Sequence, residues 1–198
     1  MPVFISIVAR TTSFIDLQRR AVESMFDDPV RYVVVNNEHG DSRFAITDHC
    51  RKAGIVVHEV PGPCPSNPSE SHAHALNWSW RNLVDDVAIF ADLDIFPVRR
   101  IRMASLFGGK PMAGVPQTRG PFIYPWPGLL PVNIRELPSS ENMNFSPVPG
   151  RDTGGLIADY LMQHDLGFRT MSLALEPDAV RRSEEHTSEL QSRQYLVC

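Results

Sequence analysis

The sequence contains few cysteines, no long apolar run and no basic segment at its start. Cys50, Cys64 and Cys198 are too few for a disulfide framework, and they lack the paired spacing of a structural zinc site. No apolar run approaches the roughly 18–20 residues that cross a bilayer. No basic residue precedes the first apolar run, which argues against a secretory signal. We therefore expect a cytoplasmic protein with no membrane span.

The chain also lacks an excess of positive charge. Its 198 residues include 19 Lys and Arg against 23 Asp and Glu, which gives a formal net charge of −4. A protein that binds nucleic acid through bulk electrostatics needs a basic surface, so we expect no nucleic-acid partner. Apolar residues make up 42% of the chain, which is enough for a real core, and the length fits one domain.

The sequence does contain an alternation of strand and helix patterns over residues 3–92. Apolar runs rich in β-branched residues are typical of strands buried on both faces, and apolar residues at helical spacing lie between them. The predicted strands are residues 3–8, 32–35, 55–60 and 87–91, and the helical patterns include Phe14, Leu17, Ala21 and Met25, then residues 71–85. This order predicts an α/β fold with a mostly parallel, Rossmann-like sheet and helices on both faces.

Polar side chains follow three of the predicted strands. Arg10 follows the first, residues 36–38 follow the second, and Asp92 and Asp94 follow the fourth. The carboxyl ends of parallel strands share one edge of the sheet, and ligands bind there, so topology alone brings these groups together. Of the 17 prolines, 15 lie at or after position 61, which predicts a loop-rich second half over that edge.

Asp92 and Asp94 form a D-x-D motif directly after a buried strand. Residues i and i+2 of an extended segment point the same way, so both carboxylates are expected at one spot. Two like charges held together there are costly unless a cation joins them. A hard divalent cation such as Mn²⁺ or Mg²⁺ fits oxygen ligands and can in turn hold phosphate oxygens. The alternative is a pair of solvated aspartates in a turn.

In this order the motifs resemble the nucleotide-sugar-dependent glycosyltransferases of the GT-A fold, especially the large family-2-like group. The resemblance is good over roughly residues 3–100 and loose over 112–175. It rests on Val34-Val35-Asn36-Asn37, Ala75-Leu76-Asn77 and the D-x-D segment from Phe90 to Pro97. It implies a metal-dependent enzyme that moves a sugar from a nucleotide diphosphate-sugar donor to a glycan or other hydroxyl acceptor.

The resemblance also implies roles for single residues. Asp94 would bind the metal, and Asp92 would contact the metal shell or the donor's ribose or sugar. Asn36 and Asn37 stand where the family has a pair of acidic residues that meet the nucleoside, and Asn77 would belong to the same nucleotide site. Asn36 departs from the family pattern, because its amide can accept a hydrogen bond from uracil N3–H only without charge assistance.

Further candidates each have an ordinary structural alternative. Arg10 is placed for a nucleotide contact, or is a surface arginine. Trp126 lies in a rigid aromatic loop, where it can stack on a donor or acceptor sugar or belong to the core. Asp152 is the candidate general base by resemblance, or a carboxylate in the first turn of a helix. His74, Asn77 and Arg81 share a helix face, on which Arg81 can meet a diphosphate or an aspartate of the D-x-D pair, or which is simply a polar surface.

Two other functions remain open. A haloacid-dehalogenase-like phosphotransferase also uses D-x-D after a buried strand, with the first aspartate as nucleophile. That family usually has the motif on its first strand, followed by a small residue and then Thr or Val, whereas Ile95 and Phe96 follow here. The other alternative is a catalytically inactive fragment that binds nucleotide-sugars.

The last 17 residues differ from the rest of the chain. They are polar, then briefly apolar, with no amphipathic period, and RSEEHTSELQS resembles the conceptual translation of a short-read sequencing adapter. We therefore expect the domain to comprise residues 1–181, and residues 182–198 to be an extraneous tail that packs on nothing. The natural chain is then expected to continue past Arg181, with a third metal ligand or a membrane-peripheral segment beyond it.

Overall fold

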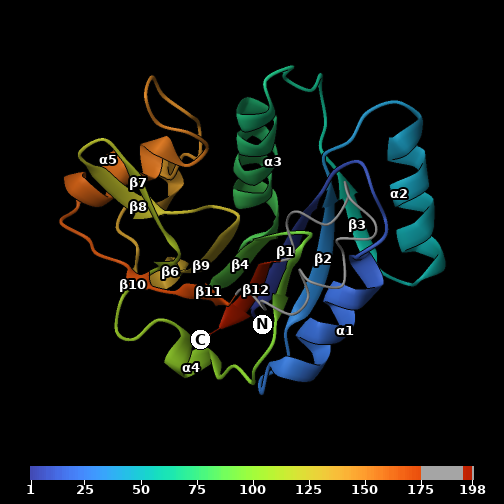
Figure 1. The fold of residues 1–198 in the computed structure, drawn as a ribbon, viewed down its shortest axis with the longest axis horizontal. Coiled ribbons are helices and arrows are strands. Elements are labelled where there is room, and N and C mark those ends of the chain that lie inside the picture. The colour runs from blue at the N-terminus through green and yellow to red at the C-terminus, as the bar shows by residue number, and fades with distance from the viewer. Residues whose placement is uncertain (175–193, 198) are drawn as a thin grey trace, which may run out of the picture.

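A five-stranded sheet in the order β3-β2-β1-β4-β9 runs through the centre of the protein (Figure 1). The structure is a computed structural model that describes residues 1–174 and 194–197. The sheet strands are β1 (Val3–Val8), β2 (Arg31–Asn36), β3 (Val56–Glu59), β4 (Val87–Asp92) and β9 (Leu129–Asn133). The first four pair in parallel, and β9 pairs antiparallel with β4, so the predicted mostly parallel sheet is confirmed.

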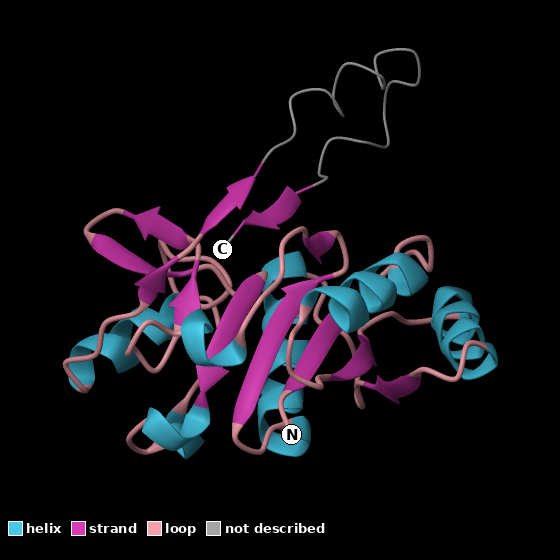
Figure 2. Ribbon diagram, turned by 90° about the horizontal axis from the view of Figure 1, so that it is seen from below, coloured by secondary structure: helices cyan, strands magenta, loops and turns pink. Residues whose placement is uncertain are grey.

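Helices cover both faces of this sheet (Figure 2). Phe4 and Val8 of β1 lie in one core cluster, and Ile5 and Ile7 lie in the other. Successive side chains of a strand point to opposite faces, so the apolar run of β1 is buried on both sides, as predicted. The first cluster includes residues of α1 (Ile15–Met25) and α2 (Asp41–Lys52), and the second includes residues of α3 (Pro68–Leu83) and α5 (Gly155–Gln163).

Helix α1 turns a different face to the core from the one that its apolar residues predict. Leu17 is 50% exposed, whereas Ile15, Gln18 and Val22 are the buried residues. The buried face is thus shifted by one residue, or about 100° around the helix axis. A pattern of apolar residues could not find it, because a polar side chain, Gln18, stands in its middle.

Helix α3 begins at Pro68, three residues earlier than the apolar pattern predicts. Asn67 caps it, because its side chain accepts hydrogen bonds from the backbone N–H groups of Ser69 and Glu70. Proline at the first helical position lacks only an N–H that would be unpaired there anyway. This extra turn brings Ser69 to the carboxyl edge of the sheet, beside the cavity described below.

Short elements and loops make up the second half of the chain, as the prolines predict. These are β5 (Ile95–Pro97), α4 (Met103–Leu106), β6 (Ala113–Gly114), β7 (Pro116–Arg119), β8 (Phe122–Pro125), β10 (Arg169–Thr170) and β11 (Ser172–Ala174). Strands β7 and β8 form a hairpin. None of the helices in the described part of the chain is both long and apolar enough to cross a membrane.

Strand β12 (Gln194–Val197) lies between β11 and β5, antiparallel to the first and parallel to the second. The expectation that residues 182–198 pack on nothing is therefore wrong for these four. Residues 182–193 and 198 lie outside the described residues. Backbone pairing at an open strand edge needs no matched side chains, so it does not test where this segment comes from. Its adapter-like origin and the domain boundary at Arg181 therefore stay predictions.

Candidate functional site

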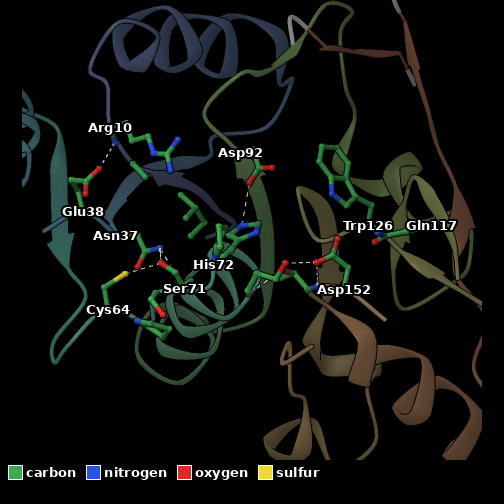
Figure 3. Close-up of a pocket in the computed structure, with 17 residues that line it drawn as sticks. Arg10, Asn37, Glu38, Cys64, Ser71, His72, Asp92, Gln117, Trp126 and Asp152 are labelled. Atoms are coloured by element: carbon green, nitrogen blue, oxygen red, sulfur yellow. Dashed lines mark hydrogen bonds and ion pairs between the residues drawn. The ribbon is translucent and has the colours of Figure 1, made fainter. Parts of the chain in front are cut away.

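A cavity of about 570 Å³ opens at the carboxyl ends of β1, β2 and β4 (Figure 3). Its walls combine the residues that follow those strands with the first turn of α3, the β7–β8 hairpin and the segment before α5. Of the residues predicted for the site, it is lined by Arg10, Asn37, Asp92, Trp126 and Asp152. This is the sheet edge at which topology predicts a ligand, and the expected convergence of polar groups there is found for Arg10, Asn37 and Asp92.

Asp92 ends β4, and its carboxylate lies beside His72 of α3. The distance from Asp92 Oδ1 to His72 Nε2 is 3.1 Å, and the side chains are 30% and 22% exposed, respectively. Among the described residues, His72 Nε2 is buried and makes no well-directed hydrogen bond, even to this close oxygen. The pair therefore places a carboxylate oxygen and an imidazole nitrogen side by side in the wall of the cavity.

Asp94 is half-buried in the turn between β4 and β5. Strand β4 ends at Asp92, and residues 93–94 form a turn, so the geometry of an extended segment does not hold across the motif. As far as the structure describes the chain, the residues that line the cavity do not include Asp94. The structure thus brings only the first aspartate of D-x-D to the cavity, contrary to the expectation that both meet there.

The side chains of Asp92 and His72 could supply some of the ligands of a divalent metal ion, with a bound substrate supplying others. Within residues 1–174 and 194–197, no group of three or more His, Cys, Asp or Glu side chains could hold a metal ion. Mg²⁺ is usually bound by one or two carboxylates, with substrate phosphates and water as its other ligands. Asp92 and His72, whose Nε2 lies 3.1 Å from Asp92 Oδ1, match that partial contribution of protein ligands.

The two asparagines that follow β2 have different surroundings. Asn36 is 1% exposed, and its amide nitrogen donates to Arg43 O at 2.9 Å and to Thr47 Oγ1 at 3.1 Å. It therefore closes the connection into α2 and does not line the cavity. Asn37 does line it, and its nitrogen donates to the carbonyl and hydroxyl oxygens of Ser71. Its Oδ1 is left as a buried acceptor that no described residue satisfies.

Arg10 lies at the rim of the cavity, next to Glu38 (Figure 3). Its φ of 68° is in the left-handed region, which is costly for a residue with a Cβ. The backbone N–H of Arg10 donates to Glu38 Oε2 at 2.7 Å and helps to hold this conformation. The loop after β1 is thus tied to the loop after β2, with a cationic side chain at their junction.

Asn77 is not at this cavity. Its Oδ1 accepts from Phe145 N at 3.0 Å, and its amide donates to Asn144 Oδ1 at 3.2 Å, so it holds the segment that precedes α5. With His74 and Arg81 it lines a separate cavity of about 480 Å³ beside α3. The helical spacing correctly predicts that these three side chains share a face, but that face lies away from Asp92.

Asp152 lies across the cavity from Asp92. Its Oδ1 accepts hydrogen bonds from the Ser69 hydroxyl and, at 2.8 Å, from Thr153 N–H, and Arg119 lies 3.7 Å from Oδ2. The hydrogen bond from Ser69 is the main reason that the pKa of Asp152 is below its ordinary value, and burial opposes it. Helix α5 begins at Gly155 and has no acidic residue in its first turn, so the alternative that Asp152 is a first-turn carboxylate is wrong.

Trp126 and Asp92 meet over Gly128. A Cβ added to Gly128 would lie 2.2 Å from Trp126 Cζ2 and 2.5 Å from Asp92 Oδ2, which only a glycine avoids. The backbone N–H of Asp92 also donates to the carbonyl oxygen of Gly128, at 2.9 Å. The indole and the carboxylate are thereby held side by side at the cavity wall.

Several lining residues were not predicted from the sequence. They come mainly from the start of α3 and the loop before it, and they include Cys64, Ser69, Ser71, His72, Gln117 and Thr153. A sequence signal for the start of α3 exists in Asn67-Pro68, a cap followed by proline at the first helical position. A helix begun there would have placed Ser69 and His72, three residues apart, on one face at the carboxyl edge.

No protein-family model matches the sequence, and no curated protein matches it. Solved structures do match. A mannosyltransferase from Pyrobaculum calidifontis, in complex with GDP-Man and Mn²⁺, has a TM-score of 0.57 and 15% identity over 85% of this chain and 53% of its own. The galactosyltransferase LgtC, in complex with donor and acceptor sugar analogs, has a TM-score of 0.46 and 13% identity over 84% and 66%.

This chain thus spans about half the length of the mannosyltransferase. At this level of identity the likeness concerns the arrangement of helices and strands, and it rests on the first of the two structures. That arrangement is the one that the β-α-β order of the sequence predicts. The chain has the GT-A type of α/β fold.

Proposed function

We propose that this chain is a glycosyltransferase domain that binds a nucleotide diphosphate-sugar with a divalent metal ion and transfers the sugar to a hydroxyl acceptor. One observation carries the proposal: a single cavity at the carboxyl edge of a GT-A fold contains Asp92, His72, Arg10 and the first turn of α3. A metal-binding carboxylate and a cationic side chain are groups that suit a diphosphate. We place the enzyme in the cytoplasm.

Asp92 and His72 would hold the metal ion, Mn²⁺ or Mg²⁺. The ion would supply the positive charge that stabilises the leaving diphosphate. The mannosyltransferase of similar fold was solved with Mn²⁺, which supports the choice of a divalent ion. Asp94 remains a candidate ligand from the sequence motif, and Asn36 and Asn77 support the loops around the site instead.

The remaining groups divide between donor and acceptor. Arg10 would contact the diphosphate, and Asn37, at the cavity wall, would contact the nucleoside. Trp126 stacks on the apolar face of a sugar. Asp152, ionised and held by Ser69, accepts the proton of the acceptor hydroxyl, although its lowered pKa makes it a weak base.

The test is release of nucleotide diphosphate from a panel of UDP- and GDP-sugars, with Mn²⁺, with Mg²⁺ and with a chelator. We expect metal-dependent release that Asp152→Asn reduces strongly. Binding of the diphosphate without turnover would instead support the inactive binding fragment. Release of phosphate from a simple phosphoester, lost in Asp92→Asn and independent of nucleotide, would contradict the proposal and support a dehalogenase-like phosphotransferase.

A further inference from the structure

Gln18 is a fully buried polar side chain in the middle of the apolar face of α1. Its amide nitrogen donates two hydrogen bonds, to Asp92 O at 2.8 Å and to Ile95 O at 2.7 Å. Its Oε1 accepts a hydrogen bond from the hydroxyl of Tyr32 at 3.0 Å. Both amide hydrogens and the amide oxygen of Gln18 therefore take part in hydrogen bonds. Two of these three bonds connect α1 to the turn between β4 and β5.

We propose that Gln18 is a positioning residue for the Asp92 carboxylate, an inference that rests on the proposed function of the site. The two carbonyls that it binds stand at the two ends of the turn from β4 into β5. A single amide that donates to both ends sets the width of this turn and hence the direction in which Asp92 leaves β4. On the other side, the N–H of Asp92 donates to Gly128 O at 2.9 Å.

The two carbonyl oxygens fix the orientation of the amide, and Tyr32 completes it. Carbonyl oxygens only accept hydrogen bonds, so the nitrogen of Gln18 must face them, and its Oε1 then accepts the hydrogen bond of the Tyr32 hydroxyl. Burial raises the pKa of Tyr32, which keeps the phenol protonated and able to donate. The chain from Tyr32 on β2 through Gln18 on α1 thus ends at the backbone of Asp92.

Loss of Gln18 should affect the ligand site more than the fold. An apolar replacement leaves two carbonyl oxygens without donors, and the turn can recover them only by moving toward water. Such a movement carries the Asp92 carboxylate away from its position 3.1 Å from His72. A displaced donor weakens metal and diphosphate binding even when the core around α1 stays packed.

The experiment compares Gln18→Met, which keeps the length of the side chain, with Val22→Ala, which removes volume from the same buried face one turn later. Titration calorimetry with Mn²⁺ plus GDP and with Mn²⁺ plus UDP is run where circular dichroism shows every variant folded. We expect Gln18→Met to raise the Kd about tenfold or more, because it removes one or two buried hydrogen bonds. Val22→Ala should lower the Tm yet leave the Kd within about twofold.

Hydrogen exchange over residues 92–96 gives a readout that needs no ligand. Exchange should be faster in Gln18→Met and unchanged in Val22→Ala. If the wild type binds neither nucleotide, the proposed function fails, and the exchange result alone decides whether Gln18 holds the turn. If Gln18→Met does not fold, Tyr32→Phe replaces it, with an expected loss of affinity of about twofold or more. Equal affinities and equal exchange rates in wild type and variant would overturn the inference.

Discussion

Asp152 has surroundings that keep it ionised at neutral pH. Its pKa is lowered chiefly by the hydrogen bond from Ser69, with help from Thr153 N–H and Arg119. A general base works best when its pKa is near the working pH. The hydrogen bonds that fix the position of this carboxylate therefore also make it a weaker base. In the proposed reaction it lies ready to receive the proton of an acceptor hydroxyl, across the cavity from Asp92.

Removal of that hydrogen bond gives a prediction with a definite sign. Ser69→Ala should raise the pKa of Asp152, which NMR titration of the carboxyl carbon measures directly. A carboxylate whose folded pKa is depressed stabilises the fold above its unfolded pKa, and this stability is lost as pH falls through the folded pKa. The acid-induced loss of stability should therefore be smaller in Ser69→Ala. Because Asp152 is 44% exposed, screening keeps the difference small. An unchanged pKa would show that Ser69 does not set it.

The contact between the β8–β9 connection and the end of β4 depends on the lack of a side chain at Gly128. Gly128→Ala would push its Cβ into Trp126 and Asp92. We expect a loss of about 1–3 kcal/mol in the free energy of unfolding, together with weaker nucleotide binding, since overpacking displaces its neighbours. Gly167→Ala is the matched control, because its Cβ would meet only the flexible end of Lys110, at 3.7 Å. Equal denaturation midpoints for the two variants would contradict this account of the wall.

The order of elements could be predicted from the sequence, because buried parallel strands are nearly continuous apolar runs. The buried face of α1 could not be predicted, because its central residue, Gln18, is polar. Gln18 is buried because it donates hydrogen bonds to residues 74 and 77 positions further along the chain. The D-x-D motif was placed at the right edge, yet a turn after Asp92 separates its two carboxylates. Similarly, Asn36 and Asn37 are adjacent in sequence, and only the local turn geometry decides which one lines the cavity.

At the scale of the whole molecule, the last residues provide a separate test. We expect deletion of residues 182–198 to change the Tm by no more than about 2 °C, which for a chain of this length is under about 1 kcal/mol. The reason is that β12 is joined to β5 and β11 by backbone pairing, which any extended segment can make. Thermal unfolding of the full and shortened chains measures the difference. A larger fall would show that β12 belongs to the fold and that the adapter-like segment is part of the natural chain.

The central claim for the molecule is that one cavity binds a nucleotide diphosphate through a metal ion held by Asp92. Titration calorimetry of GDP and UDP, with Mn²⁺ and with a chelator, compares the wild type with Asp92→Asn and with the exposed control Asp85→Asn. Asp94→Asn, which the sequence motif predicts to lose binding, is measured beside them. We predict Mn²⁺-dependent binding by the wild type and the control, and at least about tenfold weaker binding by Asp92→Asn at an unchanged Tm. Equal binding by the wild type and Asp92→Asn, or binding that the chelator does not affect, would contradict the account.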